Sequence, residues 1–192
     1  MSGQAFWYAS RATGIVALLL LTATFALGIM VTKKGRLPGL PRFAVTGLHR
    51  ALSLLAVCFL GVHIITAVLD SYVRIPLLSA VIPGVSGYER FWLSLGAIAT
   101  DLMIAMIITS LMRGRLNPLA WRVVHLTAYL SWPVALAHSI GSAKDLQQKP
   151  LVLIGVGCAL VIAVAVAIRL AGMATRVPRA RRVAHVMGKV TR

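Results

Sequence analysis

The sequence has few acidic residues, little charge of any kind and almost no cysteine. Of its 192 residues, four are Asp or Glu and 12% are charged, which is about half the share found in soluble domains. A soluble protein of this size keeps about a third of its unfolded surface exposed after folding. With 59% hydrophobic residues, this chain has too little polar surface to cover that area. A soluble enzyme and a disordered tail are therefore excluded, and the composition indicates a polytopic membrane protein of one domain.

The two cysteines, Cys58 and Cys158, are too few for a disulfide scaffold, and both lie in apolar runs. We expect both to be small apolar packing residues. The 20 Lys and Arg residues give a net charge of +16, which in a soluble chain would suggest a nucleic-acid partner. Here the basic residues lie between apolar runs, so membrane topology accounts for them and we expect no nucleic acid to bind.

Apolar runs of about 20 residues predict membrane-spanning helices, and the sequence contains five of them. The connection over residues 70–90 carries two prolines with apolar stretches between them and is predicted to hold a short surface helix. The fold class predicted is an all-α, five-helix transmembrane bundle over residues 1–173, followed by a basic tail over residues 174–192. The spans are Ala12–Val31, Leu48–Leu69, Phe91–Leu111, Leu119–Ile140 and Leu151–Ala171.

Basic residues are distributed unequally between the two sides of these spans. Five lie in the first connection, three in the third and seven at or after the end of span five, against five on the other side. By the positive-inside rule, the N-terminus is predicted outside and the C-terminus in the cytoplasm, in a cytoplasmic (inner) membrane. The basic cluster at residues 33–36 follows the first span, whereas a cleaved signal peptide has its positive charge in front. We therefore expect a retained helix.

Four of the five histidines, His49, His63, His125 and His138, fall in or at the ends of spans two and four. Ionisable groups inside a membrane are costly and rare, so each is a functional candidate. The first two are 14 residues apart and the second two 13, or about 20 Å along a helix in each case. The two spans run in the same direction, so His49 pairs in depth with His125, and His63 with His138. Two imidazoles facing each other at one depth can bind one haem iron, and two such levels would carry electrons across a core of about 30 Å.

Other uses of these histidines are packing and proton relay. A relay usually includes carboxylates, and the spans offer only Asp101, whose role the sequence leaves open. Two depth-matched pairs on parallel helices favour haem over both alternatives.

The rotation of the side chains about each helix must also agree with their depth. Fourteen residues place His49 and His63 on one face, about 40° apart, whereas 13 residues leave His125 and His138 about 140° apart. Pro133 lies between the second two. We expect a kink over Tyr129–Ala137 to turn His138 back to the shared face.

Four further residues are candidate cofactor contacts. Gly14 and Gly28 in the first span are also 14 residues apart, and a glycine at each level would let a flat macrocycle approach the backbone; ordinary helix packing is the alternative. Arg50 and Arg122 flank the cytoplasmic-side level and are candidate partners of haem propionates. For the other level the sequence offers Arg90 or Lys144.

Two segments carry a resemblance to a known family. GLHRALSLLAVCFLGVHI at 47–64 and WRVVHLTAYLSWPVALAHSIGSAKD at 121–145 resemble the paired-histidine helices of the ferric reductase-like transmembrane domain family. That family includes ferric reductases, NADPH oxidases and the haem subunit of the bacterial methionine sulfoxide reductase system. The resemblance covers about residues 7–171. It implies two b-type haems, one held by His49 with His125 and one by His63 with His138, and outward electron transfer from the cytoplasmic side.

The chain departs from the larger family members after span five. Only 21 residues follow Ala171, and they contain no glycine-rich dinucleotide fingerprint. We therefore expect a separate electron donor, either a flavoprotein or a membrane quinol, and an extracytoplasmic protein or ferric complex as acceptor. The alternatives are a quinol-linked haem subunit of an extracytoplasmic reductase and, from another class, a haem-free transporter or anchor bundle.

Overall fold

The computed structural model describes residues 3–30, 39, 41–71, 73–142 and 149–174, and within these ranges every regular element is a helix. Four of the helices, α1, α2, α3 and α6, are long and apolar enough to span a membrane. This confirms the predicted all-helical membrane fold. The elements in chain order are α1 (Gly3–Met30), α2 (Arg42–Leu69), the short 3₁₀ helix η1 (Leu77–Ala80), α3 (Arg90–Leu111), α4 (Pro118–Leu126), α5 (Ala128–Gly141) and α6 (Lys149–Ala174).

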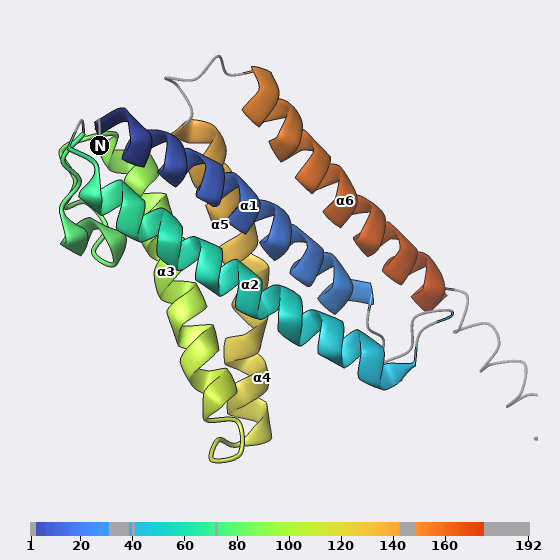
Figure 1. Ribbon diagram of the computed structural model, residues 1–192. Helices are drawn as coiled ribbons and strands as arrows, with labels where there is room; N and C mark the ends of the chain where they lie inside the picture. Colours follow the sequence, from blue (N-terminus) through green and yellow to red (C-terminus); the bar gives the residue numbers. More distant parts are fainter. Residues whose placement is uncertain (1–2, 31–38, 40, 72, 143–148, 175–192) are drawn as a thin grey trace, which may run out of the picture.

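Helix α1 lies at the centre of the bundle. It packs against α2, α5 and α6, and Figure 1 shows it running between α2 and α6. Helix α3 packs against α5, α4 and η1. The bundle therefore consists of an α1–α2 pair and an α3–α5 pair, with α6 against the outside of α1.

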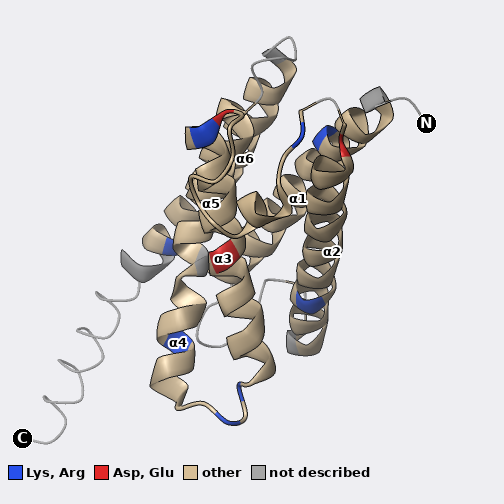
Figure 2. Ribbon diagram, turned by 90° about the vertical axis from the view of Figure 1, so that its left-hand side faces the viewer, with Lys and Arg blue, Asp and Glu red and all other residues tan. Residues whose placement is uncertain are grey.

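The buried core joins α1, α5 and α6, with Leu18, Trp132 and Ile162 among its members. Cys158 belongs to this core, while Cys58 is exposed on α2 and neither forms a disulfide. Large apolar side chains cover the outer surface of α2, where Leu54 is 64% exposed. An exposed apolar helix face is what a lipid environment requires. Figure 2 shows a basic position in the middle of α4 and one acidic position within α3; the α3 sequence contains Asp101.

The fourth predicted span, Leu119–Ile140, is divided between α4 and α5, and the break lies at Thr127. The Thr127 hydroxyl and its backbone N–H both donate to the Val124 carbonyl, at 2.6 and 2.9 Å. A threonine hydroxyl that competes for a helix carbonyl bends or interrupts the helix.

The sequence predicts a distortion at Pro133, whereas helix α5 is continuous from Ala128 to Gly141 with Pro133 inside it. The interruption of the span lies six residues before the proline, at Thr127. The proline removes one backbone hydrogen bond, and the rest of α5 tolerates that loss. The discontinuity instead lies where a side chain offers the backbone an alternative hydrogen bond.

The connection over residues 70–89 contains the predicted short helix, η1. Its Ser79, Ala80 and Tyr88 line the same cavity as residues of α2 and α3. The connection therefore covers one end of the space between the two helix pairs.

A buried hydrogen bond ties α1 to α5. The Trp132 indole N–H donates to the Thr22 hydroxyl at 2.9 Å, and that hydroxyl donates to the Leu18 carbonyl. We expect Thr22→Val to leave the indole N–H without a partner and to lower stability by about 1–2 kcal/mol. Thermal unfolding in detergent measures this. Thr66→Val is the control, because that hydroxyl is bonded only to its own helix; equal losses in both variants would contradict the prediction.

Candidate functional site

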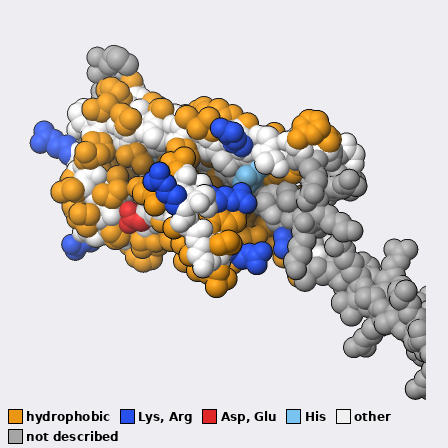
Figure 3. Space-filling model, turned by 90° about the horizontal axis from the view of Figure 1, so that it is seen from below, with side chains coloured by type: hydrophobic (Ala, Val, Ile, Leu, Met, Phe, Trp, Pro, Cys, Tyr) orange, Lys and Arg blue, Asp and Glu red, His pale blue; other side chains and the backbone are white. Residues whose placement is uncertain are grey.

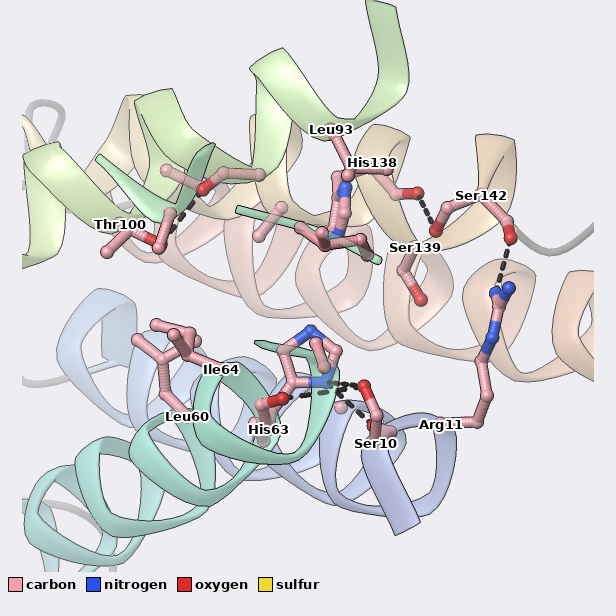
Figure 4. A pocket seen from close by; sticks show the side chains of 18 of the residues that line it. Ser10, Arg11, Leu60, His63, Ile64, Leu93, Thr100, His138, Ser139 and Ser142 are labelled. Atoms are coloured by element: carbon pink, nitrogen blue, oxygen red, sulfur yellow. Dashed lines mark hydrogen bonds between the residues drawn. The ribbon is translucent and has the colours of Figure 1, made fainter. Parts of the chain in front are cut away.

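His63 on α2 and His138 on α5 face one another across the space between the helix pairs, as Figure 4 shows. Their ring centres are 6.4 Å apart and their planes are inclined at 70°. These two residues, called the outer pair below, are thus brought together as their depth along the spans predicts.

Each ring of the outer pair is held by the neighbouring helix of its own pair. His63 Nδ1 lies 2.7 Å from the Ser10 carbonyl oxygen on α1, and His138 Nδ1 lies 2.8 Å from the Trp92 carbonyl oxygen on α3. A carbonyl oxygen can only accept, so Nδ1 is the protonated nitrogen in both rings. In a neutral imidazole the other nitrogen, Nε2, then carries a free lone pair. Each ring therefore has one nitrogen available as a ligand.

The spacing of the outer pair fits one metal between two imidazoles. A metal–imidazole bond of about 2 Å places the facing nitrogens of two opposed ligands about 4 Å apart and the ring centres roughly 6 Å apart. The observed 6.4 Å agrees. Within the described residues no group of three or more His, Cys, Asp or Glu side chains could hold a metal ion. Two protein ligands suit a metal that brings its remaining ligands with it, as haem iron does.

The cavity around the outer pair is mostly apolar. It is lined by α1, α2, α3, α5, the connection after α2 and Leu151 of α6. Small side chains form much of its wall and leave room for a flat ligand between the helix pairs. The lining alanines are Ala17, Ala56, Ala67, Ala80, Ala97, Ala99 and Ala135.

Arg11 is the basic residue that lines this cavity. Its guanidinium donates to the Ser142 carbonyl at the end of α5 and lies over the Trp7 ring, 5.0 Å from the ring centre. From the sequence, Arg90 or Lys144 is the predicted partner of haem propionates at this level. Arg90 instead donates to the Gly84 carbonyl at 2.8 Å, and Lys144 lies outside the described residues. No motif marks Arg11; only the packing of α1 on α5 identifies it.

His49 on α2 and His125 on α4, called the inner pair below, are fixed differently. They lie close enough for a charge on one to act on the other. The Nδ1 atoms of both are buried and have no hydrogen-bond partner among the described residues. The His125 ring stacks on the Trp121 ring, with 4.8 Å between the ring centres. The Arg113 guanidinium lies over the Trp121 ring, 4.4 Å from its centre.

Basic side chains surround the inner level. Arg50 and Arg122, the predicted propionate partners, are exposed and lie one and three residues from His49 and His125. Figure 3 shows Lys and Arg side chains gathered around a partly exposed histidine on this side of the molecule. Arg113, on Trp121, adds a cation that the sequence analysis did not single out.

Three glycines lie beside histidine rings. A Cβ on Gly14 would be 2.8 Å from His63 Nδ1, and one on Gly28 would be 3.9 Å from His49 Cε1. The two predicted glycines therefore do mark the two levels, but the group beside each is an imidazole. Gly96, which the sequence analysis missed, has the same relation to His138, at 2.8 Å from Cε1. Asp101 is not among the residues that line the cavity.

A family model described as ferric reductase like transmembrane component matches residues 13–136. The chain belongs to this family. The match contains His49, His63 and His125 and ends two residues before His138, which the structure places opposite His63. No curated protein and no solved structure matched the chain. Membership of the family indicates electron transfer within a membrane.

Proposed function

We propose that this protein is a di-haem b-type membrane cytochrome that carries electrons across the cytoplasmic membrane, from a donor on the cytoplasmic side to an extracytoplasmic acceptor. The observation that carries the proposal is the outer pair: two imidazoles with Nδ1 bound to carbonyls and ring centres 6.4 Å apart. Family membership supports the same class of function.

His63 and His138 would hold one haem, and His49 and His125 the other. Haem supplies one-electron redox chemistry when bound, and two imidazoles on one iron leave no open position for oxygen activation. The carbonyls of Ser10 and Trp92 keep the outer rings in one orientation. The apolar cavity wall would keep water away from the ligands. Exclusion of water helps to set the reduction potential of a haem held there.

The two levels lie along one continuous helix. α2 is regular from Arg42 to Leu69, so the 14 residues from His49 to His63 span about 21 Å. That distance covers much of a hydrocarbon core of about 30 Å. The excess of basic residues near His49 and His125 supports a cytoplasmic position for the inner pair.

The electron donor would be a separate flavoprotein or a membrane quinol. A doubly wound dinucleotide-binding unit requires parallel β-strands, and the described residues contain none. The acceptor would be an extracytoplasmic protein or a ferric complex. A quinol-linked haem subunit of an extracytoplasmic reductase is the alternative that shares the same two haem sites.

Haem content tests the proposal. Protein purified from membranes with adequate haem supply should contain two haems per chain in a pyridine haemochrome assay. His63→Ala and His138→Ala should each lower this to about one, because one axial ligand is lost. His185→Ala, which changes a histidine of the basic tail, is the control. Two haems in both outer-pair variants would refute the ligand assignment, and a colourless wild-type protein would favour the haem-free class.

Arg11 provides a second test. Its positive charge lies at the cavity, so Arg11→Gln should lower the reduction potential of the outer haem by roughly tens of millivolts, the size of about 1 kcal/mol of charge interaction. A redox titration followed by absorbance measures the shift. Arg90→Gln is the matched control, since that guanidinium bonds to the surface connection. Equal potentials in wild type and Arg11→Gln would show that Arg11 does not act on the site.

A further inference from the structure

The same local arrangement holds both histidines of the outer pair. On α1, the Ser10 carbonyl accepts from His63, and Gly14, four residues later, lies under the ring. On α3, the Trp92 carbonyl accepts from His138, and Gly96, again four residues later, lies under that ring. Two different helix pairs thus use one carbonyl and one glycine at identical spacing.

Helix geometry explains why the spacing is four. The carbonyl of residue i points along the helix toward the N–H of residue i+4, so a ring that reaches this carbonyl must lie over the backbone of residue i+4. A Cβ added to Gly14 would lie 2.8 Å from His63 Nδ1, and a Cβ added to Gly96 would lie 2.9 Å from His138 Nδ1. Both distances are shorter than atoms not bonded to each other can approach without one of them moving. Glycine is therefore required for the hydrogen bond to form.

We propose that Gly14 and Gly96 are positioning residues that allow His63 and His138 to donate Nδ1–H to a helix carbonyl and so to present Nε2 to the cavity. This inference rests on the proposed haem function of the outer pair. In this inference the two glycines contact the ligand imidazoles. The main-chain carbonyls of α1 and α3 determine which tautomer each histidine adopts. A bound carbonyl of this kind fixes both the ring orientation and the basicity of the ligand nitrogen.

The inner pair has only part of this arrangement of a carbonyl and a glycine four residues later. It therefore serves as a comparison for the outer pair. Thr24 and Gly28 stand at the same spacing on α1, and the Thr24 backbone lies near the His49 ring. A Cβ on Gly28 would be 3.9 Å from His49 Cε1, however, and His49 Nδ1 makes no hydrogen bond of normal geometry among the described residues. On α3, 14 residues after Gly96, the position is occupied by Ser110. An added methyl group should therefore matter at the outer level only.

The test compares Gly14→Ala and Gly96→Ala with Gly47→Ala and Gly61→Ala. Gly47 and Gly61 both have open space around a Cβ. Haem per chain and the low-spin ferric EPR signal, whose shape depends on the angle between the axial imidazole planes, are both measured. In the first two variants we expect the outer signal to be lost or shifted and haem to fall from two to about one per chain, with the inner signal kept. The two control variants should match wild type.

A double variant separates a collision with the ring from a general packing defect. Gly14→Ala should lower the thermal stability of haem-free protein, but adding it to His63→Gly should cause no further loss, because the ring it strikes is gone. This readout does not need bound haem, so it stands even if the proposed function fails.

Two results would overturn the inference. One is wild-type EPR signals and two haems in both Gly14→Ala and Gly96→Ala; loss of haem in His63→Ala would then still support the proposed function. The other is an equal loss of stability from Gly14→Ala with and without the His63 ring.

Discussion

The hydrogen bond from a histidine Nδ1 to a main-chain carbonyl of the neighbouring helix is the interaction on which this structure depends. In a hydrocarbon core there is no water to satisfy a polar group, so an imidazole must find its partner within the protein. His63 finds it on α1 and His138 on α3. Since the donor side of each ring is bound, the acceptor side is left toward the space between the helix pairs. The bonds that tie each pair together also determine which nitrogen is available for chemistry.

The cavity between the helix pairs reflects an uneven distribution of large and small side chains. Protein interiors normally pack to high density, and apolar space left unfilled destabilises a fold. Here the α1, α5 and α6 core packs through Leu18, Trp132 and Ile162, while small side chains such as Ala56 and Ala97 line the gap beside it. A chain that packs α1 tightly against its neighbours and leaves a cavity between the two helix pairs is suited to a flat ligand that completes the core.

Features that depend on distance along one helix could be predicted from the sequence. The spacings of His49 from His63 and of Gly14 from Gly28 are of this kind, because rise per residue converts sequence separation into depth. Gly96 could not be found in this way, since its role depends on α3 packing against α5. The break at Thr127 was missed for a different reason: proline is a strong sequence signal for distortion, whereas a hydroxyl that bonds to a nearby carbonyl depends on the local backbone.

The two levels are alike in sequence spacing but differ in what holds them. An imidazole that donates Nδ1–H to a carbonyl is a more basic ligand, which favours the oxidised metal; the outer pair has two such bonds, while His125 is held by stacking on Trp121. In the proposed function, ligand basicity alone makes the outer level harder to reduce than the inner one. The positive charge of Arg11 at the cavity acts in the opposite direction. In the proposed function, outward electron flow would therefore depend on the balance between the carbonyl bonds, which disfavour reduction of the outer level, and the positive charges that lie at each level.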